Sequence, residues 1–455
     1  MRLLQSGGFR VMINRPDERF RRMPPGRRLS KGVFMRRGIA AVLAALMLFS
    51  FAAAEDDLVI EEIVLDDETA EPAGVPDAPA PAPAETEVFT PSWGSPYPTD
   101  QGSSYWTLPM DITDEEAVWK MLMEPMTVVR IGSGNQEKKQ TYLYAEPDEN
   151  SKKIGVVTRD SQGVRVIERQ DNGWTLVECY SSSFHDTKVE AWNLLVQGYI
   201  KSEYLVQVNP NPSMGIVVDK LTQRLYIFQD GHLLTTLLCS TGLVQHNGTK
   251  WQPYNETRSG EFFLMSKVGT LKSDRMLCDM AIRFNSGDMV HEVPHVMQAD
   301  GKTKNYGSTE PKLGTKCSHG CIRVQRNKTP EGINMGWIWS KLKSGSRVKF
   351  VIWEDWQGRQ LTTPDPDTVL YYNPAGGAYY HRAETCYMAK KITFSPFLYS
   401  QLEEGEFAKL KFCPYCAPAL RQSEIDAVNQ AYAPGGDHDE NLTELRRNYY
   451  DYLLK

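Results

Sequence analysis

Apolar and polar residues alternate in short runs along residues 140–208. The runs QTYLYAEP, KIGVVTRDSQGVRVIERQDNGWTLVECY and VQGYIKSEYLVQV place apolar residues at every second position, and DSQG and DNGW turns separate them. A period of two is typical of strands with one buried face. We expect residues 104–208 to form a small β-barrel, with the stretch DEEAVWKML as a short helical lead-in.

The same alternation returns from residue 213 to residue 353. GIVVDKLTQRLYIFQDGHLLTTLLCSTGL predicts strands joined by a QDGH hairpin turn, and GEFFLMSKVG, DMAIRFNSGDMVHEVPHV, CIRVQ and SGSRVKFVIWED predict further strands. TPEGINMGWIWSKLK has the spacing of a helix. This block predicts an open mixed β-sheet or a sandwich, so the fold class is mainly β.

The first hundred residues lack this periodicity. MRRGIAAVLAALMLFSFAAAEDD has the basic lead, apolar run and small residues of a signal peptide, or of an uncleaved anchor, within residues 1–54. Residues 55–103 are acidic and then Pro/Ala-rich, which predicts a disordered linker.

Charge supports export. Residues 1–54 hold eleven Lys/Arg and two Asp/Glu, so removing their +9 from the whole-chain −6 leaves −15. So acidic a remainder disfavours nucleic acid as a partner, and a membrane would be met only through an uncleaved anchor. We expect an extracytoplasmic protein, secreted or attached to the wall or membrane.

The stretch TKCSHGCIRVQRNK concentrates the candidate chemistry. A thiol attacks carbonyls as its thiolate, which neighbouring positive charge or histidine favours, and Cys321 has Lys316, His319 and Arg323 near it in sequence. Gly320 leaves room for a substrate carbonyl to approach the backbone amides. MVHEVPH supplies two candidate bases, His291 and His295. From composition alone, a reactive and a structural cysteine are equally supported.

These residues carry a resemblance. SHGCIRV, from Ser318 to Val324, resembles the signature of the L,D-transpeptidases, and the likeness extends over residues 213–353, including TRSGEFFL where the family has a Thr-Pro-x-Gly turn. The family fold is a β-sandwich. Residues 140–208 resemble a bacterial Src-homology-3-like domain through Gly173, Trp174 and Val177 and through GYI---YL at 198–205.

The resemblance implies an enzyme acting on peptidoglycan stem peptides without a catalytic cofactor. Cys321 would attack the L-to-D bond at the third stem residue, release D-alanine and leave a thioester, which an acceptor amine resolves into a 3→3 cross-link. The implied site has His291 as base, amides at His319 and Gly320 for the oxyanion, and Arg323, Ser318 and Tyr306 toward substrate. An L,D-carboxypeptidase using the same residues, or a non-catalytic wall-binding scaffold, are the alternatives.

One departure from the family concerns the 26 residues between His291 and Ser318, which exceed the usual spacing. The insert QADGKTKNYGSTEPKLG predicts a long loop, a candidate lid. It leaves the base open between His291 and His295, with the strand pattern favouring His291.

A cysteine-containing module is expected at residues 364–455. His381, Cys386, Cys413 and Cys416 form a His-x4-Cys … Cys-x2-Cys set, which suits a structural zinc ion. A disulfide involving Cys413 is the alternative that export favours. The CPYC tetrad also matches glutaredoxins, but too little chain follows it for that fold.

Overall fold

The computed structural model describes residues 109–455, apart from 185–186, 247, 249–251, 274, 344, 356–358, 390, 434, 437–451 and 453–455. The predicted signal or anchor segment and the whole of the predicted linker lie outside these residues. No helix in the described part of the chain is long and apolar enough to cross a membrane.

The N-terminal module is a five-stranded antiparallel sheet in the order β3-β2-β6-β5-β4. Its strands are β2 (Gln140–Tyr144), β3 (Lys153–Thr158), β4 (Arg165–Arg169), β5 (Trp174–Ser182) and β6 (Trp192–Lys201). β1 (Met126–Val129) pairs separately with β7 (Leu205–Val208), which follows the 3-10 turn η1 (Ser202–Tyr204). The strands expected from the alternation are therefore present. The DNGW turn between β4 and β5 depends on Gly173, whose φ is +85°.

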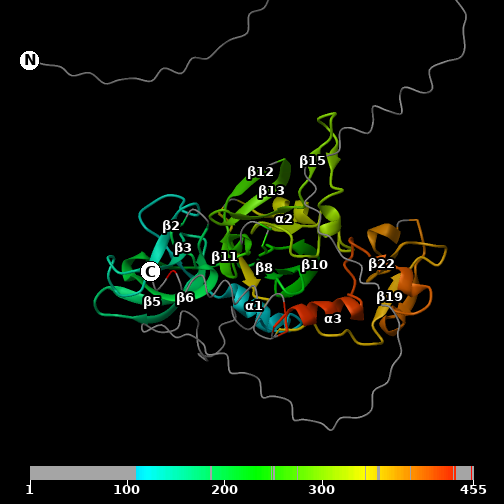
Figure 1. The fold of residues 1–455 in the computed structure, drawn as a ribbon, viewed down its shortest axis with the longest axis horizontal. Coiled ribbons are helices and arrows are strands. Elements are labelled where there is room, and N and C mark those ends of the chain that lie inside the picture. Colours follow the sequence, from blue (N-terminus) through cyan, green and yellow to red (C-terminus); the bar gives the residue numbers. More distant parts are fainter. Residues whose placement is uncertain are drawn as a thin grey trace, which may run out of the picture. The chain divides into compact units, whose positions relative to one another are not determined.

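The second module is one nine-stranded mixed sheet in the order β11-β18-β8-β9-β10-β17-β14-β13-β12 (Figure 1). Its strands are β8 (Met214–Asp219), β9 (Arg224–Gln229), β10 (His232–Ser240), β11 (Gly260–Leu264), β12 (Lys267–Ser273), β13 (Met276–Asn285), β14 (Asp288–Glu292), β17 (Ile322–Val324) and β18 (Val348–Trp353). β8 with β18 and β14 with β17 are parallel pairs, and the other pairs are antiparallel.

This sheet curls around a single core. Residues of its two halves, such as Ile216 and Phe262 in one and Ile282 and Phe284 in the other, belong to the same buried cluster. The sandwich expected from the resemblance is thus a continuous half-barrel sheet whose halves face each other. The core is closed by α2 (Met335–Lys341), which is shorter than the helix expected over TPEGINMGWIWSKLK because Asn334 caps its N-terminus.

The helical lead-in is α1 (Glu115–Met123), capped by Asp114, and it packs on the nine-stranded sheet. Val118, Met121 and Leu122 lie against the outward side chains of β8, β9 and β18, namely Val217, Phe228, Val351 and Trp353. Although α1 precedes the N-terminal sheet in the chain, it therefore covers the second module.

The predicted long loop is a hairpin. β15 (Val296–Met297) pairs with β16 (Lys304–Asn305), and the 3-10 turn η3 (Glu310–Lys312) follows; another such turn, η2 (Pro253–Asn255), precedes β11.

The C-terminal module has a four-stranded sheet in the order β21-β19-β20-β22. Its strands are β19 (Val369–Tyr372), β20 (Tyr379–His381), β21 (Ser395–Leu398) and β22 (Lys411–Phe412), with 3-10 turns η4 (Tyr387–Ala389), η5 (Tyr399–Gln401) and η6 (Phe407–Lys409) and the helix α3 (Gln422–Ala431). A small aromatic core and the buried cysteines hold it together.

Candidate active site

The parallel pair β14–β17 places the predicted nucleophile and one predicted base on the same face of the sheet. Val290 is in register with Ile322, and His291 with Arg323. Val290 and Ile322 point into the core. Because side chains alternate along a strand, His291 and Arg323 point to the opposite face. Cys321, the residue before β17, interacts electrostatically with Arg323 and Arg283 and so lies on the same side.

His291 is held in one orientation. Its Nδ1 atom lies 2.7 Å from the backbone carbonyl of Glu292, so Nδ1 carries the proton and donates, which leaves Nε2 as an acceptor. Burial lowers the pKa of His291 to about 4, the Glu292 carbonyl partly opposes this, and the positive charge of Arg323 adds to it. The imidazole is therefore neutral and able to accept a proton at neutral pH.

Cys321 is half-buried and is not a preformed thiolate. Burial, and after it the carboxylate of Asp288, raise the pKa of its thiol to about 12, although a hydrogen bond from the Met289 backbone acts to lower it. The expectation of a thiol activated by surrounding positive charge is wrong for this resting state. A thiol that is neutral at rest must instead lose its proton during the attack.

Lys316 and Arg323, the cations near Cys321 in sequence, do not surround its thiol in the structure. Lys316 points into a buried acidic cluster, where its Nζ atom is 2.8 Å from Asp355 and 3.1 Å from Glu256. The Arg323 guanidinium lies 3.3 Å from the sulfur of Cys317 and contributes only the last of the effects on Cys321.

The backbone around Cys321 is fixed by three hydroxyl and amide contacts. The Thr257 hydroxyl donates to the carbonyl of Gly320 at 2.8 Å, the Ser318 hydroxyl donates to the carbonyl of Cys321, and the Gly320 amide donates to the Ser318 oxygen at 3.2 Å. Ser318 thus acts within the loop, and the Gly320 amide already has a partner. The His319 side chain is exposed.

The loop that precedes Cys321 is clamped to the end of β10. The amides of Cys317 and Ser318 donate to the carbonyl of Thr241, and the amide of Leu243 donates to the carbonyl of Ser318 at 3.0 Å. Gly242 also lets the chain after β10 pass close to η2, since a Cβ there would lie 1.9 Å from the carbonyl oxygen of Asn255.

His295 and Tyr306 belong to the hairpin side of the site. The amide of His295 donates to the carbonyl of Leu277 on β13, the strand that lies on the far side of β14 from β17. The Tyr306 hydroxyl donates to Glu292 at 3.1 Å, and its ring contacts the guanidinium of Arg326. Tyr306 therefore anchors the hairpin to β14 in this structure.

A buried charged cluster beside the loop was not predicted. Its members are two lysines and three carboxylates, Lys220, Lys316, Glu256, Glu354 and Asp355. Burial opposes the charge of each lysine, but the carboxylates outweigh it and raise both lysine pKa values. The cluster joins the ends of β8 and β18, the loop before β11 and the loop before Cys321.

The four side chains of the predicted zinc set meet in the C-terminal module. His381, Cys386, Cys413 and Cys416 are all buried, and each offers a ligand atom within 4.8 Å of the others. The sulfurs of Cys386 and Cys413 are 3.9 Å apart, and the sulfur of Cys416 is 3.7 Å from Nδ1 of His381. The amide of Arg382 donates to the Cys416 sulfur at 3.4 Å.

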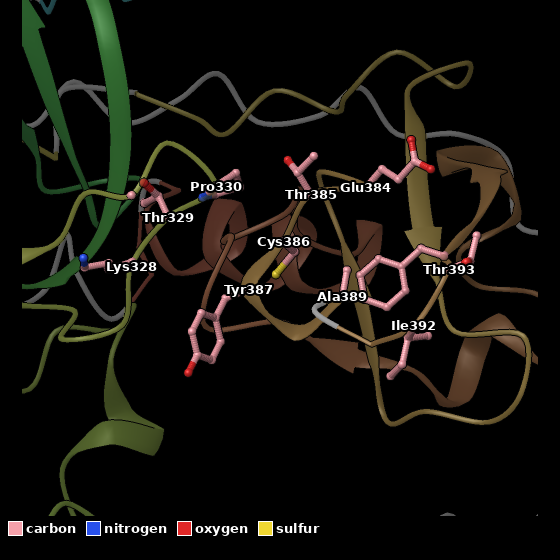
Figure 2. Close-up of a pocket in the computed structure, with 12 residues that line it drawn as sticks. Lys328, Thr329, Pro330, Glu384, Thr385, Cys386, Tyr387, Ala389, Ile392 and Thr393 are labelled. Carbon is pink, nitrogen blue, oxygen red and sulfur yellow. The ribbon is translucent and has the colours of Figure 1, made fainter.

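A cavity of about 580 Å³ adjoins this cluster. Figure 2 shows Lys328, Thr329 and Pro330 of the catalytic module on one side and Thr385, Cys386 and Tyr387 on the other. Cys386 therefore borders both the cavity and the ligand cluster, whereas Cys321 is not among the residues that line the cavity.

The family model of the L,D-transpeptidase catalytic domain matches residues 213–350. A comparison with curated proteins gives no match.

Solved L,D-transpeptidase structures are similar to parts of the chain. That of Xylanimonas cellulosilytica is 17% identical, over 31% of this chain and 60% of that one, with a TM-score of 0.22. One from Mycobacterium smegmatis is 12% identical, over 51% and 92%, with a TM-score of 0.24. One from Mycobacterium tuberculosis is 16% identical, over 54% and 86%, with a TM-score of 0.24. The chain thus spans less than two thirds of the first of these.

The family model covers the strands β14 and β17, the SHGC element and the core around which the nine-stranded sheet curls. Residues 213–350 are an L,D-transpeptidase catalytic domain, and this part of the chain belongs to a family of cysteine transpeptidases.

Proposed function

We propose that the protein is an exported L,D-transpeptidase that joins peptidoglycan stem peptides through a thioester on Cys321. The family acts on peptidoglycan peptides outside the cytoplasm. The observation that carries the proposal for this chain is the β14–β17 register, which sets Cys321 and His291 on one face while the carbonyl of Glu292 fixes the His291 tautomer.

The proposed first half-reaction begins with proton transfer from the Cys321 thiol to Nε2 of His291. The sulfur attacks the carbonyl of the L-to-D bond at the third stem residue and forms a tetrahedral oxyanion. When the C–N bond breaks, the D-alanine amine takes the proton back from the imidazolium, and the acyl group stays on sulfur as a thioester.

In the second half-reaction an acceptor amine attacks the thioester and gives its proton to His291. The C–S bond breaks, the sulfur recovers a proton, and a 3→3 cross-link is released. Water in place of the amine would yield a trimmed tripeptide, which is the carboxypeptidase alternative. The hairpin containing Tyr306 is the candidate cover for the donor stem, and Arg323 is a candidate partner of its carboxylate.

The tetrahedral oxyanion needs a backbone N–H donor other than the Gly320 amide named in the sequence analysis. Since the Gly320 amide already donates to Ser318, the amide of Cys321 itself is the proposed oxyanion contact. Ser318 would shape this turn and would not bind substrate directly. His291 is proposed as the base over His295, which pairs with β13.

Two measurements test the proposal. Purified exported protein is incubated with a carbapenem, and intact mass should show one covalent adduct that Cys321→Ala lacks. Incubation with tetrapeptide muropeptides should then give cross-linked dimers by mass. Tripeptides alone would favour the carboxypeptidase, and absence of any adduct on the unmodified chain would leave the non-catalytic scaffold.

The module at residues 364–455 is proposed to hold a structural zinc ion. A tetrahedral zinc with Zn–S bonds of about 2.3 Å keeps its sulfur ligands about 3.8 Å apart, which fits the 3.9 Å between Cys386 and Cys413. A disulfide would need those sulfurs at about 2.05 Å. The N–H of Arg382 pointing at Cys416 also suits a metal-bound thiolate.

The N-terminal sheet is proposed to be Src-homology-3-like, as its GYI---YL and Gly-Trp patterns suggest. The signal peptide, with cleavage near Ala54, and the disordered linker at 55–103 are likewise proposals, which N-terminal sequencing of the exported protein tests.

A further inference from the structure

Arg258 is a buried arginine at the position where the resembling family has proline in its Thr-Pro-x-Gly turn. Its Nη1 atom lies 3.2 and 3.3 Å from the two oxygens of Asp288, which begins β14. Both side chains are almost fully buried, with exposures of 1% and 3%. A buried ion pair of this kind persists only where other groups satisfy it, since each charge alone is costly to desolvate.

One of those groups is the carbonyl of Glu256, to which Nη1 donates at 3.1 Å, and two others come from the segment that follows β5 of the N-terminal sheet. Nη2 of Arg258 donates to the carbonyl of Ser183 at 2.5 Å, and its guanidinium carbon lies 4.0 Å from the centre of the Phe184 ring. The same ring is packed against the β13–β14 turn, because a Cβ at Gly287 would lie 3.0 Å from it. The end of β5 and the residues after it thus hold Arg258 in place.

A second contact from the N-terminal sheet reaches the same carboxylate. The Thr158 hydroxyl donates to Oδ1 of Asn285 at 2.5 Å, and Nδ2 of Asn285 donates to Asp288 at 3.4 Å. Both neighbours of Asp288 are therefore positioned by residues of the N-terminal module.

The ion pair lies directly against the turn that carries the nucleophile. Gly320 has a φ of +115°, and a Cβ there would lie 2.7 Å from Oδ1 of Asp288 and 3.1 Å from Nη1 of Arg258. Asp288 also faces the sulfur of Cys321, together with Cys278 on β13, Arg323 on β17 and Arg283 on β13. Any movement of the pair changes both the shape of the turn and the charge beside the thiol.

We propose that the N-terminal sheet completes the transpeptidase site, by using Ser183 and Phe184 to hold Arg258 on Asp288 beneath Gly320 and Cys321. This rests on the proposed role of Cys321 as nucleophile. Arg258 is then a positioning residue, and the sheet is an integral support of the catalytic turn. A sheet that only binds wall polymer would leave the acyl transfer chemistry unaffected by changes at Phe184.

The test uses the full exported chain and the rate of carbapenem acylation, followed by intact mass. Phe184→Ala removes the ring on Arg258 and leaves the residues of the Gly320–Cys321 turn unchanged, and Phe184→Tyr keeps the aromatic face. Trp174→Ala is the matched control, because its ring packs edge-on against Tyr144 within the same sheet. Thermal unfolding of each variant is measured alongside.

We expect Phe184→Ala to slow acylation roughly tenfold or more, Phe184→Tyr to restore most of the rate, and Trp174→Ala to acylate normally despite lower stability. Asp288→Asn supplies a readout of charge: alkylation of Cys321 by iodoacetamide, localised by peptide mass, should shift to lower pH, because the carboxylate no longer opposes the thiolate.

Full acylation by Phe184→Ala, or equal slowing by Phe184→Ala and Trp174→Ala in proportion to lost stability, would overturn the proposal. An unshifted alkylation profile in Asp288→Asn would overturn the placement of the pair. If the unmodified chain forms no adduct at all, the proposed function fails instead, so the two failures are distinguishable.

Discussion

The hydroxyl of Thr257 donates a 2.8 Å hydrogen bond to the carbonyl of Gly320, 63 residues further along the chain. The same oxygen accepts the amide of Gly242. One side chain thus joins the loop before β11, the end of β10 and the turn that carries Cys321.

Replacing Thr257 with valine should impair the turn while conserving its shape and volume. The Gly320 carbonyl and the Gly242 amide would lose their common partner inside the protein, at a cost of about 1–3 kcal/mol in unfolding free energy. We expect carbapenem acylation to slow at least tenfold, as the turn loses its register. Thr235→Val is the control, since that buried hydroxyl bonds to Glu331; equal acylation rates for the two variants would contradict the prediction.

Lys316 should matter for stability more than for the charge of the thiol. Lys316→Met leaves Glu256 and Asp355 with one ammonium group fewer in a buried cluster, and breaking such pairs costs about 3–5 kcal/mol. Chemical denaturation should show this loss. Lys312→Met, four residues earlier and exposed, should unfold like the unmodified chain. A stable Lys316→Met variant that had lost acylation alone would instead assign Lys316 to the chemistry.

In the pH profile of the acylation rate, the acid limb should lie at an unusually low pH. A base must be unprotonated, and burial holds the pKa of His291 at about 4, so the rate should persist below pH 6 and fall only as the pH approaches that value. Circular dichroism at each pH separates this limb from unfolding. An acid limb near pH 6.5, on a folded protein, would show that the imidazole is solvated when it acts.

Metal content tests the C-terminal cluster. We expect one zinc ion per chain by elemental mass spectrometry, lost in Cys413→Ser, with a lower melting temperature for that variant and for chelator-treated protein. Cys239→Ser is a matched change of another buried cysteine that should keep the metal. Zinc-free protein with two fewer titratable thiols would identify a disulfide in its place.

The alternation of apolar residues predicts most of the strands, because many of them bury one face and so repeat with period two. Strands β8, β11, β14 and β18 are buried along their whole length. The same pattern predicts that the histidines His291 and His295 follow or lie on a strand, which could bring one of them within reach of Cys321. The curled half-barrel form of the nine-stranded sheet is harder to predict from sequence, since it depends on β10 continuing from one half of the sheet into the other.

The electrostatics of the site could not be predicted from sequence proximity. Lys316 is five residues from Cys321, yet its partners are Glu256 and Asp355, which reach it from distant loops. Conversely, Asp288 influences the thiol from another strand. Short-range charge patterns describe neighbours along the chain, whereas thiol ionisation responds to burial and to neighbours in space.

Helix α1 packs on the nine-stranded sheet, although the whole N-terminal sheet lies between α1 and that sheet in the sequence. A fragment cut at residue 213 would carry every catalytic residue but would bare the apolar patch of Val217, Phe228 and Val351 that α1 shields. Such a fragment should aggregate, so the catalytic segment should not be soluble as an isolated domain without α1. Its folding must wait until β18, some 225 residues after α1, has been synthesised.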